Sequence, residues 1–160
     1  MGEAELASEG RDMTTIAWDG TTLAADRCSW SGPARRRVRK VFKVRAPDGR
    51  MFLVAFAGNG DFAMAILAWM RGRGEKPNAA DFNVERDSCC GVIVDERRRV
   101  WQIPASLVYG QPMRERKFAQ GAGQEFAWGA LEAGASARKA VEIAAKRSDY
   151  AGLGVDCVRF

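Results

Sequence analysis

A threonine and an aspartate near the front of the chain could together support nucleophilic chemistry. Alternating residues over 16–18, an Asp-Gly pair at positions 19 and 20, and a return segment over 21–25 predict a hairpin with a two-residue turn. This hairpin brings Asp26 beside Thr14. A threonine that stands first in its chain carries a hydroxyl nucleophile and an amine base on one residue. Cleavage of the bond before Thr14 would therefore create a minimal active site.

The segment before that threonine has the composition of a leader. Residues 1–12 are mostly small or acidic, and they lack the basic and apolar regions of a secretory signal. We therefore predict a leader or propeptide over residues 1–13, disordered or removed, and a hydrolase domain over residues 14–160. A translation start at Met13, followed by removal of that methionine, would expose Thr14 in the same way.

The absence of histidine narrows the chemistry further. The chain has 160 residues, a net charge of +5 and no histidine, which excludes His-based nucleophile activation and His-ligated metals. Its four cysteines include the adjacent pair Cys89-Cys90, whose spacing does not suit a zinc site. We expect free, largely buried thiols and neither a metal nor a cofactor. No apolar run approaches the roughly 20 residues that span a bilayer, and we expect a cytoplasmic protein.

Much of the positive charge is concentrated in one stretch. Such a run could bind nucleic acid or an acidic partner. However, it has no interleaved aromatic residues for base stacking and no recognisable nucleic-acid motif beside it. A solvated surface is the favoured interpretation, and nucleic-acid binding ranks last among the functions considered. The basic residues are Arg35, Arg36, Arg37, Arg39, Lys40, Lys43 and Arg45.

Apolar segments and turn signals divide the rest of the chain into short strands and helices. Residues 51–57 form a continuous apolar strand, which must be covered on both faces. Asp61 is the predicted N-cap of the next helix, and Ser136 caps a later helix with a stripe of small residues. Because hairpins dominate, we predict an α+β fold, a four-layer α-β-β-α sandwich with largely antiparallel sheets. The other predicted elements are a loop over 27–33, strands over 41–44, 89–94, 99–103 and 155–160, a short strand over 118–123 that runs through glycines into the next helix, and that helix over 124–133, whose apolar face includes Phe126 and Leu131.

The order of these motifs resembles the proteasome β-subunit family. The segments Thr14-Thr15-Ile16 and Leu23-Ala24-Ala25-Asp26, then a lysine, then Phe56-Ala57-Gly58 before a helix, are similar to HslV-type subunits and to the shorter proteasome-like proteins of bacteria and phages. The resemblance covers nearly the whole chain from Thr14 onward. It implies the N-terminal nucleophile hydrolase fold and a threonine-type endopeptidase.

The resemblance also implies an assembly. Subunits of this family form stacked homo-oligomeric rings that enclose a proteolytic chamber, and their substrates are peptides or unfolded proteins. The chain has no Walker-type phosphate loop, so a separate ring ATPase is the implied partner for bulk substrates. No membrane partner is expected.

Four residues match the catalytic positions of the family. The resemblance assigns the nucleophile to Thr14, the buried carboxylate to Asp26, the active-site lysine to Lys40 and the oxyanion-hole amide to Gly58. A positive charge on Lys40 disfavours protonation of the neighbouring amine, and a glycine N–H can approach a reacting carbonyl closely. Strand alternation favours Lys40 over Lys43, because Lys43 shares its face with a further arginine.

The sequence departs from the family at positions that support the N-terminal amine. The usual Gly-Ser-Gly element is Gly-Ala-Gly here, with Ala122 in the place of the serine. A later Arg-Asp-x-x-Ser-Gly segment is Arg-Ser-Asp-Tyr-Ala-Gly, which leaves Ser148 or Asp149 for the aspartate position. Two alternatives therefore stay open: a catalytically inactive ring-forming subunit that keeps its leader, and an amidase for small amides. Position alone places Phe56 and Asn59 near the S1 pocket.

Overall fold

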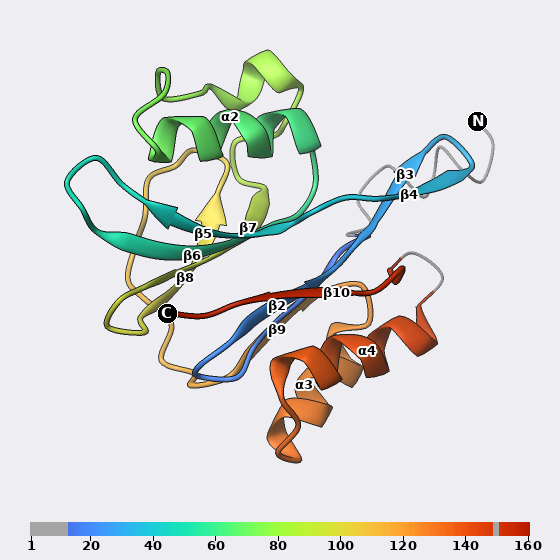
Figure 1. The fold of residues 1–160 in the computed structure, drawn as a ribbon. Helices are drawn as coiled ribbons and strands as arrows, with labels where there is room; N and C mark the ends of the chain where they lie inside the picture. Colours follow the sequence, from blue (N-terminus) through green and yellow to red (C-terminus); the bar gives the residue numbers. More distant parts are fainter. Residues whose placement is uncertain (1–12, 149–150) are drawn as a thin grey trace.

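A computed structural model describes residues 13–148 and 151–160 of the chain. Two four-stranded sheets pack face to face, with helices on both outer faces (Figure 1). Every strand pairing is antiparallel, which confirms the predicted α-β-β-α sandwich. One sheet has the order β10-β2-β1-β9, with β10 Val155–Val158, β2 Leu23–Asp26, β1 Thr15–Trp18 and β9 Phe118–Gly121. The other has the order β5-β6-β7-β8, with β5 Val41–Arg45, β6 Met51–Phe56, β7 Cys89–Asp95 and β8 Val100–Pro104.

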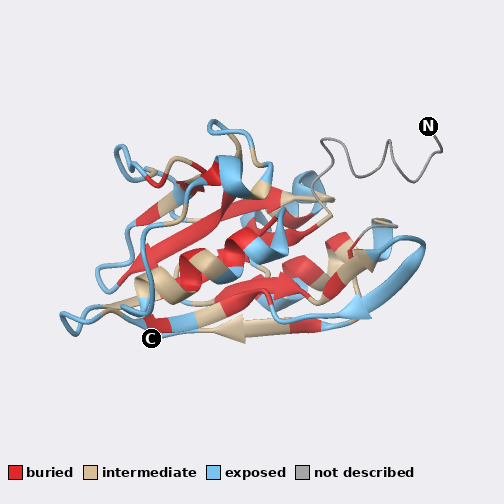
Figure 2. Cartoon of the chain, turned by 90° about the horizontal axis from the view of Figure 1, so that it is seen from above, coloured by how far each residue is buried: buried red, intermediate tan, exposed pale blue. Residues whose placement is uncertain are grey.

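The apolar strand β6 is buried on both faces, as predicted. Leu53 and Ala55 face the space between the two sheets, whereas Val54 and Phe56 pack beneath helix α2, Gly60–Met70. Successive side chains of a strand point to opposite faces, so an uninterrupted apolar run requires two apolar neighbours. Buried stretches occur in the strands of the sandwich and in the helices that cover it (Figure 2), and the buried apolar residues form three clusters.

The outer helices of the other sheet are α3, Gln124–Glu132, and α4, Ala137–Arg147. The small residues Ala140, Val141 and Ala144 of α4 are fully buried against alanines of β1 and β2. Ser136 caps this helix by accepting a hydrogen bond from the N–H of Lys139, as predicted. Small side chains on both surfaces allow the helix to approach the sheet closely.

The predicted apolar face of α3 is wrong at Phe126. Its side chain is 45% exposed, whereas Ala127 and Leu131 are fully buried. The buried residues are spaced by four positions and so share one face of the helix. Phe126 is rotated by about 100° from Ala127 around the helix axis and therefore faces away from that contact.

The turn between β1 and β2 is longer than predicted. Trp18 pairs with Leu23, so the loop spans residues 19–22. The Asp19 carboxylate accepts hydrogen bonds from the backbone N–H and hydroxyl of Thr21 and from the first residue of α4. These bonds organise a wider loop and tie it to the outer helix, which explains why the two-residue turn does not form.

The predicted N-cap of α2 is also wrong. Asn59, not Asp61, is the cap: its side-chain oxygen accepts a hydrogen bond of 2.8 Å from the N–H of Phe62. The helix begins at Gly60, which places Asp61 in the first turn. An acidic residue there still interacts favourably with the positive end of the helix dipole.

The predicted loop over residues 27–33 is wrong, because most of it belongs to a further hairpin. Strands β3, Cys28–Ser31, and β4, Ala34–Arg37, pair through a tight turn at positions 32 and 33. Gly32 has φ = +61°, which suits the first central position of such a turn. We call residues 28–37 the basic hairpin; it extends away from the sandwich (Figure 1).

The remaining described segments connect these layers. A short 3₁₀ helix, Ala79–Phe82, lies between α2 and β7. All four cysteines are free, but only Cys28 and Cys90 are buried; Cys157 is half-buried and Cys89 is exposed, so the expected burial is only partly correct. Among the described residues, no helix has the length and apolarity needed to cross a membrane.

Candidate active site

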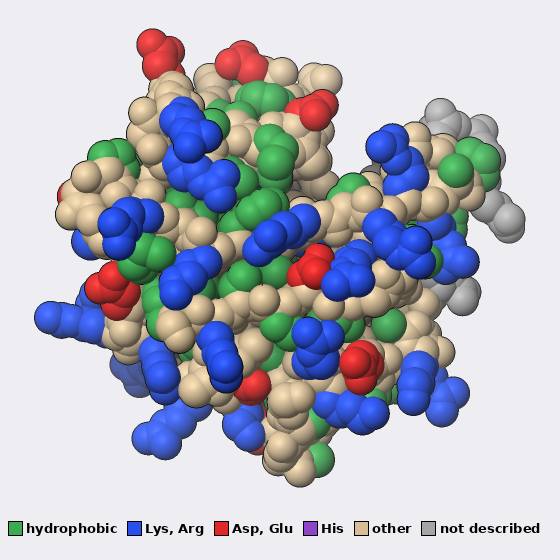
Figure 3. Space-filling view, in the orientation of Figure 1, with side chains coloured by type: hydrophobic (Ala, Val, Ile, Leu, Met, Phe, Trp, Pro, Cys, Tyr) green, Lys and Arg blue, Asp and Glu red, His purple; other side chains and the backbone are tan. Residues whose placement is uncertain are grey.

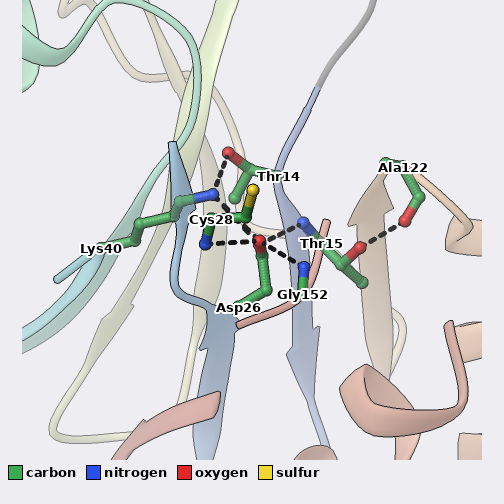
Figure 4. Close-up of polar contacts among 7 residues, drawn as sticks. All are labelled: Thr14, Thr15, Asp26, Cys28, Lys40, Ala122 and Gly152. Carbon is green, nitrogen blue, oxygen red and sulfur yellow. Dashed lines mark hydrogen bonds and ion pairs between the residues drawn. The ribbon is translucent and has the colours of Figure 1, made fainter. Parts of the chain in front are cut away.

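The carboxylate of Asp26 organises the end of the sandwich where the described chain begins. It is fully buried and accepts backbone hydrogen bonds from Thr15 at 2.9 Å, Cys28 at 3.0 Å and Gly152 at 3.1 Å (Figure 4). These donors come from three segments that are far apart in sequence. Asp26 therefore fixes the start of β1, the start of β3 and the approach to β10 relative to one another.

The same carboxylate holds the ammonium group of Lys40. Lys40 Nζ lies 3.1 Å and 3.2 Å from the two oxygens of Asp26, and it donates a hydrogen bond of 3.0 Å to Thr14 Oγ (Figure 4). The lysine is 8% exposed, so little water screens its charge. Lys43 is exposed, and the structure thus brings Lys40 rather than Lys43 to the threonine.

Thr14 is buried at the start of β1, and its backbone is fixed by the end of β9. The N–H of Ala122 donates a hydrogen bond of 2.9 Å to the carbonyl oxygen of Thr14. The hydroxyl of Thr15 donates to the carbonyl oxygen of Ala122 in return. Because Met13 precedes Thr14, the nitrogen of Thr14 is an amide and cannot act as a base.

Gly58 lies between β6 and α2 and lines the same cleft as Thr14 and Lys40. Its φ is +83°, a region that residues with a Cβ adopt rarely. A Cβ added at Gly58 would meet no atom within 4 Å, so conformation rather than space explains the glycine. The structure supplies a backbone N–H beside the cleft, close to the N-terminus of a helix.

The cleft around Thr14 has a volume of about 680 Å³. Phe56 lines it, as the sequence suggests, but Asn59 does not, because its side chain caps α2 and donates to the carbonyl oxygen of Phe82. Most of the other lining side chains are apolar, which suits an apolar substrate side chain. These apolar lining residues are Met13, Trp30, Val38, Phe42, Ala57, Ala63 and Met64.

The pKa of the Cys28 thiol depends on burial and on the charges around the cleft. Burial raises the pKa of this thiol, and the nearby Asp26 carboxylate raises it further. The charges of Lys40 and Arg35 act in the opposite direction. Within the described part of the chain, no three cysteine or carboxylate side chains gather as the ligands of a metal ion.

Of the predicted supporting residues Ala122, Ser148 and Asp149, the structure brings Ala122 into contact with Thr14. Ala122 contacts Thr14 through its backbone, as described above. Ser148 is the C-cap of α4 and lines a separate surface hollow with Gly152 and Trp30. Asp149 lies outside the described residues.

Sequence reasoning missed the contacts that hold Asp26 and the hairpin that forms one wall of the cleft. The Thr15 and Gly152 N–H groups leave no local signal, because any non-proline residue can donate a backbone bond. The hairpin did leave a local signal in the sequence. Gly32 is the first central residue of a tight turn between two short segments, and a glycine at that position is typical of a type II′ turn.

Comparisons with known proteins identify the fold. BPH from Thiobacillus denitrificans matches with a TM-score of 0.62 at 20% sequence identity, covering 92% of this chain and 96% of that one. Eukaryotic HslV from Trypanosoma brucei matches with a TM-score of 0.59 at 18% identity, covering 90% and 97%. The chain has the fold of HslV-type proteasome subunits. The predicted resemblance is thus confirmed at the level of the fold.

A further neighbour with the HslV-type fold is Anbu, an ancestral β-subunit. The protein from Yersinia bercovieri matches with a TM-score of 0.59 at 16% identity, covering 91% of this chain and 79% of that one. No protein-family model matches the sequence, and no curated protein matches it significantly. The likeness is therefore one of fold, at low sequence identity.

Proposed function

We propose that the chain is a threonine-type peptidase whose nucleophile is Thr14, exposed when the bond after Met13 is cleaved. The observation that carries this proposal is that the buried ammonium group of Lys40 contacts both the Thr14 hydroxyl and the Asp26 carboxylate. Lys40 Nζ lies 3.0 Å from Thr14 Oγ and 3.1 Å from the Asp26 carboxylate. The ammonium group has three donors, so it can hold the Asp26 carboxylate and still donate to a hydroxyl, and this hydroxyl belongs to the residue that cleavage would place first in the chain.

The reaction follows from this arrangement once Thr14 has a free amine. Thr14 Oγ attacks the carbonyl carbon of the scissile amide, and its proton passes to the α-amine. The N–H of Gly58 donates to the oxyanion of the tetrahedral intermediate. The C–N bond then breaks, and the leaving amine takes the proton from the α-ammonium group. A Thr14 ester remains.

Water completes the cycle. The α-amine accepts a proton as water attacks the ester, and that proton returns to Thr14 Oγ when the carboxylic acid leaves. A positive charge on Lys40 favours the deprotonated Oγ and disfavours protonation of the amine. Asp26 orients the lysine and takes no part in proton transfer.

The proposal extends to assembly. The fold neighbours include a helical assembly of the Anbu complex from Pseudomonas aeruginosa, which matches with a TM-score of 0.65 at 14% identity. For this chain we propose a cytoplasmic homo-oligomer, built as stacked rings around a chamber, with a separate ring ATPase that supplies unfolded polypeptide. Subunits that surround a chamber would restrict access to Thr14.

The proposal is tested with a chain released so that Thr14 is its first residue. We expect it to hydrolyse an unstructured peptide and to produce new carboxyl and amino termini, detected by mass spectrometry. The same chain with Met13 retained should be inactive, as should Thr14→Ala. Thr14→Ser should keep measurable activity, because serine supplies the same hydroxyl and amine. Equal hydrolysis by the Met13-retaining chain would contradict the proposal.

A second candidate is an inactive subunit with the same fold. Ala122 favours it, because this residue offers only backbone groups beside Thr14 where a serine hydroxyl is usual in the family. Ala122→Ser separates the two candidates. In a peptidase with weakened support of its amine, the added hydroxyl should raise kcat; in a purely structural subunit, both proteins should stay inactive.

A further inference from the structure

One wall of the cleft that holds Thr14 continues into the basic hairpin. Residues 28–30 of β3 and residues 38–40 after β4 line the cleft. The base of the hairpin is closed by a hydrogen bond of 2.8 Å from the N–H of Val38 to the carbonyl oxygen of Arg27. The hairpin is therefore fixed to the cleft at both of its ends, and its outer part extends beside the cleft opening.

The arginines of this hairpin carry uncompensated charge. No acidic residue occurs between Arg27 and Pro47 in the sequence. Arg27 is bonded to Asp156 at 2.8 Å, but within the described residues the arginines at 35–37 form no ion pair. All three are exposed, and blue side chains cover the extension formed by the hairpin (Figure 3).

Two of these arginines pair with Cys28 and Trp30, which line the cleft, although Ser29 on the other face lines it as well. Arg35 also borders the separate hollow that Ser148 lines. Arg35 pairs with Trp30 and Arg37 with Cys28, and paired residues of antiparallel strands share a face. The guanidinium carbon of Arg35 lies 6.0 Å from the centre of the Trp30 ring. Its charge also acts on the thiol of Cys28 inside the cleft. Arg36 pairs with a serine on the opposite face.

The distance from these arginines to the nucleophile matches the reach of an extended substrate. Residues 38–40 lie between β4 and β5, and an extended chain spans at most about 3.6 Å per residue, so Arg37 and Arg35 lie within roughly 11 Å and 18 Å of Lys40, which contacts Thr14. A peptide bound in extended form advances by the same amount per residue. An extended substrate would therefore need about three to five residues to reach from the scissile bond to these arginines.

We propose that Arg35 and Arg37 make the cleft selective for acidic polypeptide substrates, by contacting aspartate or glutamate side chains about three to five residues from the bond that is cut. This inference rests on the function proposed above for the cleft. Nucleic acid fits the hairpin less well, because base stacking needs free aromatic faces and the ring of Trp30 already carries Arg35.

Binding is measured separately from catalysis, on the full chain carrying Thr14→Ala. The probes are a fluorescent glutamate-rich peptide, its glutamine-substituted analogue and a single-stranded oligonucleotide of similar length. We expect the acidic peptide to bind about tenfold more tightly than its analogue at low salt, with a smaller ratio at about 0.15 M salt. The added change R35E/R37E should abolish the preference, and R35K/R37K should restore most of it.

The matched control is R97E/R98E, which changes the net charge by the same amount in another exposed turn. That turn follows Asp95, which pairs with Phe52, whereas the cleft lies at the other end of β6, beyond Phe56. In R97E/R98E the preference for the acidic peptide should persist. A preference lost equally in both double variants would overturn the proposal, because net charge would then explain it. Tighter binding of the oligonucleotide than of the acidic peptide would also overturn it.

Cleavage provides the second measurement. With Thr14 intact and exposed, peptides carrying glutamates about three to five residues from the cut should show a kcat/KM about tenfold above that of glutamine analogues. If no peptide is cleaved but Thr14→Ala still prefers the acidic peptide, the proposed activity fails while the binding inference stands. If peptides are cleaved without any acidic preference, only the selectivity assigned to Arg35 and Arg37 fails.

Discussion

At the scale of single residues, the site depends on the buried Lys40, which contacts both Asp26 and Thr14. Lys40 balances the charge of Asp26 and also reaches the hydroxyl of Thr14. A buried charge left without its partner destabilises a protein strongly, so the two roles are linked. Stability and activity must therefore be measured together for any change at this position.

Lys40→Met removes the charge and keeps a similar side-chain length. We expect kcat for peptide hydrolysis to fall by about 100-fold or more, because a positive charge beside the nucleophile is lost. The free energy of unfolding should fall by about 3 kcal/mol, because Asp26 is left buried without its cation. Lys43→Met is the matched control: it makes the same change at an exposed position, and both quantities should stay close to those of the unmodified chain. Full activity in folded Lys40→Met would contradict the assigned role.

The adjacent thiols at positions 89 and 90 should differ in reactivity. Cys90 is 5% exposed, and burial raises the pKa of its thiol to about 11, whereas Cys89 is exposed. The thiolate is the reactive form, so iodoacetamide should modify Cys89 well before Cys90 in the folded protein. Peptide mapping over a time course provides the measurement, and Cys89→Ser confirms the assignment. Equal rates at the two residues would contradict the burial of Cys90.

At the scale of secondary structure, periodic signals predicted the elements that are buried and missed those that are exposed. The apolar run of β6 and the stripe of small residues on α4 correctly predicted that β6 is buried on both faces and that α4 packs closely, because burial on defined faces constrains residue types. The basic hairpin lacks a regular apolar face, so its arginines gave only a charge signal. The N-cap was misplaced because Asn59 and Asp61 are both good caps, and the two alternatives differ only in where the helix begins.

The sequence predicted the residues that gather at the candidate site better than it predicted the contacts that hold them. Thr14, Asp26 and Lys40 come together as the family resemblance implies. Two of the backbone donors to Asp26, those of Thr15 and Gly152, and the carbonyl that accepts from Thr15 come from other segments of the chain. Such contacts depend on the three-dimensional pairing of strands, which one sequence does not encode in local patterns.

The middle of β7 contains a glycine that the sheet requires. A Cβ at Gly91 would lie 1.9 Å from the carbonyl oxygen of Ala55, and φ there is +145°. Gly91→Ala should therefore lower the free energy of unfolding by about 3 kcal/mol or more, measured by denaturant titration. Gly129→Ala, in an exposed and open position of α3, should instead stabilise the protein by up to about 1 kcal/mol. A small effect at Gly91 would contradict the close strand approach.

The loop between β1 and β2 should make stability depend on pH through Asp19. Burial alone would raise the pKa of this carboxyl, but hydrogen bonds from the N–H groups of Ala137, Thr22 and Thr21 outweigh burial and lower it from 3.8. A lowered pKa in the folded state means that the carboxylate stabilises the protein above the unfolded-state pKa. That contribution is lost as the pH falls through the folded-state pKa.

Asp19→Asn tests this dependence. The free-energy gap between the unmodified chain and this variant should be largest near neutral pH and should shrink below about pH 4. Asp87→Asn, at an exposed position, is the matched control and should show a much smaller gap. Urea titrations across the acid range provide the measurement, and a gap that grows toward low pH would contradict the hydrogen-bond assignment.

At the scale of the whole molecule, the two sheets bring the start of β1, the end of β2 and the start of β5 to one end of the sandwich. Thr14, the buried carboxylate of Asp26 and Lys40 lie there (Figure 4), beside a cleft that is lined in part by the base of the basic hairpin. The net charge of +5 is therefore unevenly distributed, with uncompensated arginines near the site. The proposed chemistry and the proposed charge selection would therefore act at the same end of the molecule, and the chemistry depends on cleavage of the bond between Met13 and Thr14.

Intact-mass spectrometry of the purified full chain, before and after treatment with a threonine-directed β-lactone, tests the central claim most directly. We predict a species that begins at Thr14 and gains the mass of one β-lactone adduct. The adduct should be absent from Thr14→Ala and strongly reduced in Lys40→Met. A chain that keeps the residues up to Met13 and gains no adduct would contradict the claim that Thr14 is an N-terminal nucleophile.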